Sequence, residues 1–161
     1  MNPSIKRFQQ LINNPLKFKL FLLLKLPAAF FAGLSIQQFN AEKTIVKVRY
    51  NWFTKNPFKS MYFAVEAMAA ELSTGLLVFG QVYHRFPKMS MLVVEMKVEF
   101  VKKATGTIQF TCEEGLKIQE AVNQSIADGE GKIFTITSIG ANAQNEMVAI
   151  FHFTWSVKAK Q

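Results

Sequence analysis

Two carboxylates, Glu66 and Glu71, stand in a stretch of the chain that otherwise carries no charge. From Tyr62 to Tyr83 they are the only charged side chains, and most of their neighbours are small or apolar. A helix of this composition lacks a polar face, so it is expected to be enclosed by other structure. A carboxylate on an enclosed helix costs free energy unless it is paired or hydrogen-bonded. That cost makes both residues candidates for function, because a carboxylate can serve as a general base or a nucleophile.

Residues 56–75 predict the long central helix that positions these carboxylates. Asn56 suits the N-cap, and Pro57 suits the first helical position, where a missing N–H costs nothing. The helix is expected to fray between Gly75 and Gly80.

The two carboxylates are not expected to act on the same face. They are five residues apart, which corresponds to about 140° around a helix. Glu66 is therefore expected to reach solvent or a basic partner such as Arg49, with a catalytic role as the alternative.

The composition predicts one domain with a large core. The chain has 161 residues, half of them hydrophobic and 16 of them Phe, which argues against disorder. The single cysteine, Cys112, excludes an intramolecular disulfide and is compatible with a reducing compartment, so we expect a cytoplasmic protein. The sequence has no zinc-ligand cluster, Gly-rich phosphate loop or G-x-S-x-G elbow. No metal and no resident cofactor are expected.

The charge balance favours an anionic partner. The net charge is +8, and the first 41 residues contain no acid but five basic residues, Lys6, Arg7, Lys17, Lys19 and Lys25. Such a balance suits nucleic acid, a membrane surface or a phosphate-bearing small molecule. Nucleic acid is disfavoured, because no recognised module is present and the Phe residues are expected to be buried.

The N-terminal segment, residues 1–27, predicts one or two short basic helices over residues 4–25, ended by Pro27. An apolar block at 20–24 after basic residues is also a feature of signal peptides. Lys25 interrupts that block, no A-x-A cleavage site is evident, and the run is too short to span a bilayer. We expect this segment to pack on the domain, with weak membrane-surface contact or export as the alternatives.

The rest of the chain alternates apolar and polar residues with the period of strands. Strands are predicted at 34–40, 43–53, 92–100, 107–113, 132–139 and 147–157. Inward faces are expected from Val46, Val48, Tyr50 and Trp52, then Leu92, Val94, Met96, Val98 and Phe100, then Ile108, Phe110 and Cys112, and last Phe151, Phe153, Trp155 and Val157. A second helix is predicted at 116–127, with Leu116 on its apolar face, stopped by the turn at 128–131. Antiparallel strands around one early helix make an α+β domain spanning residues 1–161.

This arrangement resembles the hotdog fold, in which a curved antiparallel sheet wraps a long central helix. The hotdog thioesterases of the phenylacetate-degradation type read Asn, a short gap, Gly-Thr/Ser-x-His-Gly-Gly, then an acid nine residues after the His. Here Asn56, Ser60 and Glu71 match that pattern, whereas Tyr62 replaces the His and Phe63-Ala64 replace Gly-Gly. The stretch Asn-Pro-Phe-x-Ser … Ala-x-Ala-Glu-x-x-x-Gly looks still more like an uncharacterised family within the hotdog superfamily.

The resemblance implies an acyl-CoA thioesterase or a thioesterase-like protein that works as a homodimer or a tetramer. It implies Glu71 as base or nucleophile, Asn56 as a residue that orients water or the carbonyl, and the backbone N–H groups of Ser60, Met61 and Tyr62 as oxyanion donors. Coenzyme A would enter as part of the substrate, with its phosphates near Arg85, Lys88, Lys102 and Lys103.

Each of these roles has a structural alternative. The alternative for Asn56 is a plain N-cap, and the alternative for Glu71 is a structural carboxylate hydrogen-bonded across the dimer. Tyr62 could donate its hydroxyl to a ligand or simply pack. His84 and His152 are expected to be structural, which leaves Ser60 without a triad. A non-catalytic acyl- or lipid-binding dimer is therefore the alternative function, and a hydratase is disfavoured because no His stands beside the helix start.

Overall fold

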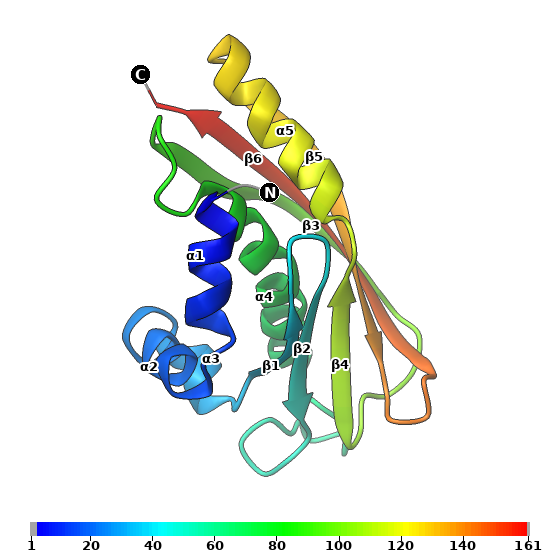
Figure 1. Cartoon of the computed structure of the whole chain (residues 1–161). Coiled ribbons are helices and arrows are strands. Elements are labelled where there is room, and N and C mark those ends of the chain that lie inside the picture. The colour runs from blue at the N-terminus through cyan, green and yellow to red at the C-terminus, as the bar shows by residue number, and fades with distance from the viewer. Residues whose placement is uncertain (1–2, 161) are drawn as a thin grey trace.

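A curved, six-stranded antiparallel sheet wraps one long helix, as Figure 1 shows. The computed structural model describes residues 3–160, so residues 1, 2 and 161 of the expected domain lie outside the described residues. The strand order is β1-β2-β4-β5-β6-β3, which leaves β1 and β3 at the two edges. The elements are α1 (Pro3–Ile12), α2 (Pro15–Lys25), α3 (Pro27–Phe31), β1 (Ser35–Phe39), β2 (Thr44–Arg49), α4 (Phe63–Val82), β3 (Met89–Phe100), β4 (Thr107–Cys112), α5 (Gly115–Asp128), β5 (Lys132–Ala141) and β6 (Met147–Ala159). This is the predicted α+β hotdog arrangement.

Alternating side chains of the sheet form the core around α4. The predicted inward rows of β4 and β6 are buried, as are Val46 and Val48 of β2. However, β2 ends at Arg49, where a turn begins in which Asn51 accepts the N–H of Phe53. The prediction that Trp52 continues the inward row is therefore wrong, and its side chain is 80% exposed. The predicted inward row of β3 is wrong at Leu92 and Val94, which are exposed, because an irregularity between Val93 and Glu95 shifts the alternation of the strand.

The central helix begins at Phe63, not at Asn56, and it continues to Val82 without a break. A Cβ at Gly80 would lie 3.1 Å from the rings of Phe8 and Phe39. The glycine thus allows α1 and β1 to approach the helix closely, and the predicted fraying near it is wrong. By length and composition α4 could cross a membrane, but here it is the core helix enclosed by the sheet.

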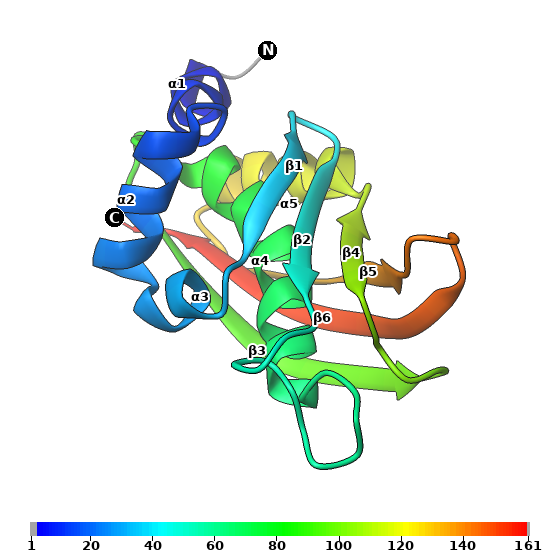
Figure 2. The ribbon, with the colours of Figure 1, turned by 90° about the horizontal axis from the view of Figure 1, so that it is seen from below.

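The N-terminal helices pack on the domain as predicted. Figure 2 shows α1, α2 and α3 grouped beside β1 and α4. Phe8 is fully buried, and its ring contacts those of Phe39, Phe79 and Tyr83. The two helices predicted over residues 4–25 are α1 and α2, and α2 ends at Lys25 as expected. Pro27 then opens a further short helix, α3, where it occupies the first turn.

The second predicted helix is α5, which ends at Gly129 in the left-handed conformation. Its buried face consists of Ile118, Ala121, Val122 and Ser125, which follow helical spacing. Leu116 lies off this row and is 64% exposed, so its predicted position on the apolar face is wrong.

Two buried hydrogen-bonded contacts fix α4 against the sheet. The hydroxyls of Ser73 in α4 and Ser138 in β5 are 2.7 Å apart, and both residues are fully buried. The Ser73 hydroxyl donates to the Ala70 carbonyl at 2.7 Å, so the proton between the two serines comes from Ser138. The Trp155 indole N–H of β6 donates to the Thr74 hydroxyl at 3.3 Å.

The serine pair predicts an asymmetric loss of stability. Ser73→Ala leaves the buried Ser138 hydroxyl without its acceptor and is expected to lower the free energy of unfolding by about 1–3 kcal/mol. Ser138→Ala leaves Ser73 bonded to Ala70, so its loss is expected to be smaller. Chemical denaturation of both variants measures the difference. An equal loss, or a larger loss for Ser138→Ala, would contradict the assigned donor.

Candidate functional site

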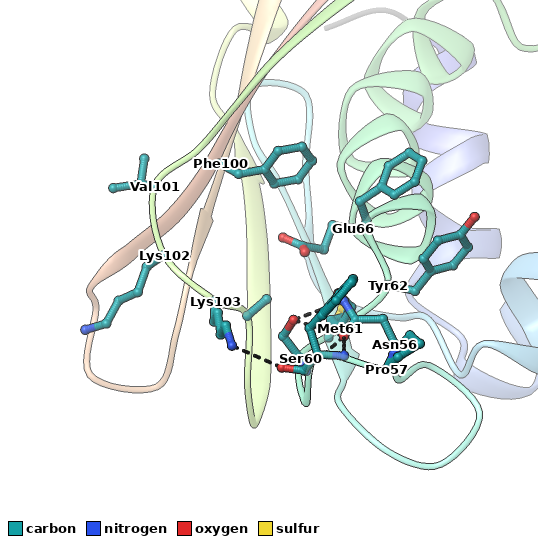
Figure 3. A pocket seen from close by; sticks show the side chains of 13 residues that line it. Asn56, Pro57, Ser60, Met61, Tyr62, Glu66, Phe100, Val101, Lys102 and Lys103 are labelled. Atoms are coloured by element: carbon teal, nitrogen blue, oxygen red, sulfur yellow. Dashed lines mark hydrogen bonds between the residues drawn. The ribbon is translucent and has the colours of Figure 1, made fainter.

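A cavity of about 570 Å³ lies in front of the first turn of α4 (Figure 3). Three parts of the chain surround it: the loop 56–62, the first turn of α4 with Glu66, and the segment 100–104 between β3 and β4. Most of the lining is apolar, with rings from Phe58, Tyr62, Phe63 and Phe100. The site therefore combines a helix N-terminus with an open, mostly apolar cavity.

Asn56 organises the loop that leads into this helix. Its Oδ1 accepts the backbone N–H groups of Phe58 at 2.9 Å and Ser60 at 3.2 Å. Its Nδ2 donates to the Ser60 hydroxyl and the Met61 carbonyl, both at 3.0 Å. Asn56 is thus the first residue of a hydrogen-bonded turn and not the N-cap, and Pro57 is not in the helix. Tyr62 is the residue that precedes the helix, and its side chain makes no cap hydrogen bond.

The free N–H groups of α4 lie later in the chain than Ser60, Met61 and Tyr62. The Ser60 N–H donates to Asn56, the Met61 N–H to the Ala104 carbonyl at 2.8 Å, and the Tyr62 N–H to the Thr54 carbonyl at 2.8 Å. All three expected oxyanion donors are therefore engaged within the fold.

The first four N–H groups of α4 itself divide into two pairs. The N–H groups of Val65 and Glu66 both donate to the Tyr62 carbonyl, at 2.9 and 3.4 Å. Those of Phe63 and Ala64 have no acceptor among residues 3–160. Such unsatisfied donors at a helix start carry a partial positive charge and can bind an oxygen of a ligand.

Glu66 is buried in the wall of the cavity, with only 4% of its surface exposed. Its Oε2 has no hydrogen-bond partner among residues 3–160, and burial raises the pKa of its carboxyl from 4.5 to about 7. Figure 3 shows the carboxyl directed away from α4, between Phe100 and Ser60. The expectation that Glu66 reaches solvent or Arg49 is therefore wrong.

Glu71 lies in a different cavity, of about 450 Å³, between α4, α2 and Met91 of β3. Its neighbours there are mostly apolar, and burial raises the pKa of its carboxyl. Glu71 is eight residues beyond Phe63, a rise of about 12 Å along the helix. Within one chain, the cavity at the helix start brings together Asn56, Ser60, Met61, Tyr62 and Glu66, but not Glu71.

The four expected basic residues separate into two groups. Lys102 and Lys103 line the cavity at the helix start; Lys102 pairs with Glu146 at 2.7 Å and Lys103 donates to the Phe58 carbonyl at 3.1 Å. Arg85 and Lys88 follow the other end of α4. Arg85 donates to the Asn123 side chain at 2.7 Å, and burial lowers the pKa of its guanidinium.

Comparison with known proteins identifies one family and one fold. Residues 16–157 match the model of the family described as a domain of unknown function, DUF4442. No curated protein matches the chain.

Several solved structures share the fold. A Pseudomonas aeruginosa protein of unknown function, described as a probable thioesterase, aligns with a TM-score of 0.75 at 18% identity over 91% of this chain and 97% of that one. A Haemophilus influenzae thioesterase aligns with a TM-score of 0.63 at 14% identity over 87% and 88% of the two chains. The PaaI protein of the Escherichia coli phenylacetic acid degradation operon aligns with a TM-score of 0.65 at 12% identity over 94% and 96%. These neighbours confirm the hotdog fold.

The role of Asn56 in the loop predicts a local loss of order. Asn56→Ala removes the acceptor of the Phe58 and Ser60 N–H groups and is expected to cost about 1–3 kcal/mol of stability. Amide hydrogen exchange should show faster exchange at these two positions. Asn51→Ala is the matched control, because Asn51 holds a similar turn that does not line the cavity. Unchanged protection of Phe58 and Ser60 in Asn56→Ala would contradict the assignment.

Proposed function

The chain belongs to the DUF4442 family, and on that premise we propose that it hydrolyses acyl thioesters, with acyl-CoA as the substrate, at a site shared between two protomers. The observation that carries the proposal is the start of α4. The N–H groups of Phe63 and Ala64, which have no acceptor among the described residues, stand there, and Phe63 lines a mostly apolar, open cavity. Thioester hydrolysis places negative charge on the carbonyl oxygen in the transition state. Fixed N–H donors in a water-poor site stabilise that charge.

The second requirement of the reaction is a base or nucleophile, and Glu71 is the proposed residue. Its carboxylate takes a proton from the attacking water and returns it to the sulfur as the carbon–sulfur bond breaks, so that the acid and the thiol are released. In the alternative, the carboxylate attacks the carbonyl carbon and expels the thiolate, and water then hydrolyses the mixed anhydride on Glu71, supplying the proton that the thiolate takes up. Burial raises the Glu71 pKa, which makes the carboxylate a stronger proton acceptor than an exposed Glu.

A dimer resolves the separation between these two groups. Glu71 and the free N–H groups line different cavities of one chain, so they can act on the same carbonyl only if they come from different protomers. The edge strand β3 supports such a pairing. Leu92, Val94 and Met96 are 66%, 53% and 42% exposed there, and an exposed apolar edge is a surface on which another strand pairs.

The four basic residues expected to bind coenzyme A lie at opposite ends of α4. Lys102 and Lys103 line the rim of the cavity at the helix start and are proposed to bind coenzyme A phosphates, whereas Arg85 and Lys88 lie by the other end of α4. Assembly beyond a dimer, a cytoplasmic location and weak membrane-surface contact through the N-terminal segment stay predictions.

A non-catalytic acyl-binding dimer is the second candidate function. Tyr62, Phe63 and Ala64 stand where thioesterases of the phenylacetate type have His-Gly-Gly. The apolar cavity beside Glu71, lined by Phe21, Leu72, Leu76 and Phe79 among others, could hold an acyl chain without any reaction.

Release of free thiol from a panel of short, long and aromatic acyl-CoA thioesters tests the proposal. Glu71→Gln is expected to abolish turnover and to leave ligand binding intact. No turnover of any member, with saturable binding of one, would support the acyl-binding alternative. Turnover that persists in Glu71→Gln would contradict the assigned base.

The same assay tests the helix start through Phe63→Pro, with Phe63→Ala as the matched control. Both variants lose the ring, but only proline removes the N–H. Tyr62 already has the extended backbone (φ −67°, ψ 128°) that a following proline requires. Removing one oxyanion donor typically lowers kcat by about 10²–10³-fold. We therefore expect a loss of this size in Phe63→Pro relative to Phe63→Ala, and equal rates in the two variants would exclude the Phe63 N–H as a donor.

The β3 edge predicts the oligomeric state. Val94→Lys places a charge on the exposed edge strand and is expected to convert a dimer into a monomer, with loss of turnover. Ile139→Lys is the matched control, because Ile139 is 42% exposed on β5 and pairs with Thr111 of β4 on one side and Ile150 of β6 on the other. Light scattering after gel filtration measures the mass. A Val94→Lys variant that stays dimeric would contradict pairing through β3.

A further inference from the structure

Glu66 lines the same cavity as Phe63, whose N–H is a proposed oxyanion donor, and it is not the proposed base. Its side chain is buried, and its Oε2 has no partner in the described structure. A buried polar atom without a partner costs free energy, and such atoms are rare in folded proteins. A ligand that forms a hydrogen bond with Oε2 would remove this cost.

The charged and titratable groups around the cavity do not neutralise Glu66. Lys102 bonds to Glu146, and Lys103 bonds to the Phe58 carbonyl. Tyr62 lines the cavity from the loop side, and Glu71 on the same helix lies in the other cavity. With no cation bonded to it, the buried carboxyl favours its neutral form.

The pKa of Glu66 agrees with this geometry. Burial raises it to about 7, so roughly half of the molecules carry a neutral Glu66 at neutral pH, and most do at pH 6. A neutral carboxyl has one O–H donor. In this cavity that donor is available to a ligand.

Helix geometry places this donor near the proposed oxyanion site. Glu66 and Phe63 are three residues apart and therefore neighbours on the helix surface. Helical side chains lean toward the N-terminus, so the Glu66 side chain covers the turn that contains Phe63 and Ala64. Figure 3 shows the carboxyl on the side of α4 that faces the cavity.

We propose that neutral Glu66 donates a hydrogen bond to the carbonyl oxygen of the bound acyl group, together with the N–H groups of Phe63 and Ala64. This inference rests on the proposed function and names the third donor of its oxyanion site. The Glu66 proton stays on Glu66 throughout, while the proton of the attacking water goes to Glu71. Ionised Glu66 would repel the developing oxyanion, so only the neutral form supports turnover.

The proposal is tested by the pH dependence of kcat/KM in the wild type, Glu66→Gln and Glu66→Leu. We expect wild-type activity to fall as the pH rises through about 7, since the active neutral form is lost. Glu66→Gln keeps an N–H donor and cannot ionise, so it should retain activity within about tenfold and lose this limb of the profile. Glu66→Leu should lose about 10²–10³-fold in kcat, as expected for one oxyanion donor.

Two outcomes of this experiment would overturn the proposal. If Glu66→Gln is as inactive as Glu71→Gln, Glu66 acts as a base or nucleophile and not as a donor. If Glu66→Leu keeps the wild-type rate and profile, Glu66 does not contact the reacting carbonyl at all.

A binding measurement separates failure of this proposal from failure of the hydrolysis. The probe is a ketone analogue of acyl-CoA in which a methylene group replaces the sulfur, added to the full-length protein with ¹³C-labelled Glu carboxyls. The Glu66 resonance is assigned by its absence in Glu66→Gln. A hydrogen bond from the neutral form raises its pKa when the analogue binds.

If the pKa of Glu66 rises on binding but no thioester is hydrolysed, the proposed hydrolysis is contradicted and the contact between Glu66 and the carbonyl is supported. A pKa that is unchanged or lowered, or an analogue that does not bind, would overturn the contact.

Discussion

The enclosure of α4 by the sheet is the constraint on which the rest of the molecule depends. The helix has apolar or small residues on almost every side, so it is stable only when other elements cover it. The curved sheet covers one side, α1 and β1 pack near Gly80, and the Ser73–Ser138 contact fixes the helix against β5. The first turn of the helix stays accessible, because the loop 56–62 and the segment 100–104 leave a cavity there.

This enclosure also explains why the two carboxylates are unusual. Burial raises the pKa of both Glu66 and Glu71, and neither forms an ion pair among the described residues. The two residues lie on different faces of α4, so each lines a different cavity. Proteins keep such costly groups mainly where they act on a ligand. A site assembled from two protomers would use both: Glu66 from the chain that supplies the helix start, and Glu71 from its partner.

The architecture could be predicted from the sequence because it depends on the periodic spacing of apolar residues, which is regular in β4, β6 and α5. The start of α4 could not, since Asn56-Pro57 has the same local signature in a hydrogen-bonded turn as in a helix cap. The burial of Glu66 could not be predicted from the sequence either. The segment 100–104, which lines the same cavity, lies more than thirty residues away in the chain. Trp52 was misplaced because periodicity does not tell where a strand ends. Leu116 was misplaced because it lies about 200° around the helix from the buried Ile118.

The central claim is that one active site needs the helix start of one protomer and Glu71 of the other. The most direct measurement is complementation between Phe63→Pro and Glu71→Gln, each inactive alone, co-expressed with different tags so that mixed dimers form. The account predicts restored thioesterase activity, at about a quarter of the wild-type level if the chains pair at random, since each mixed dimer has one complete site. Mixed dimers that stay inactive would contradict the shared site.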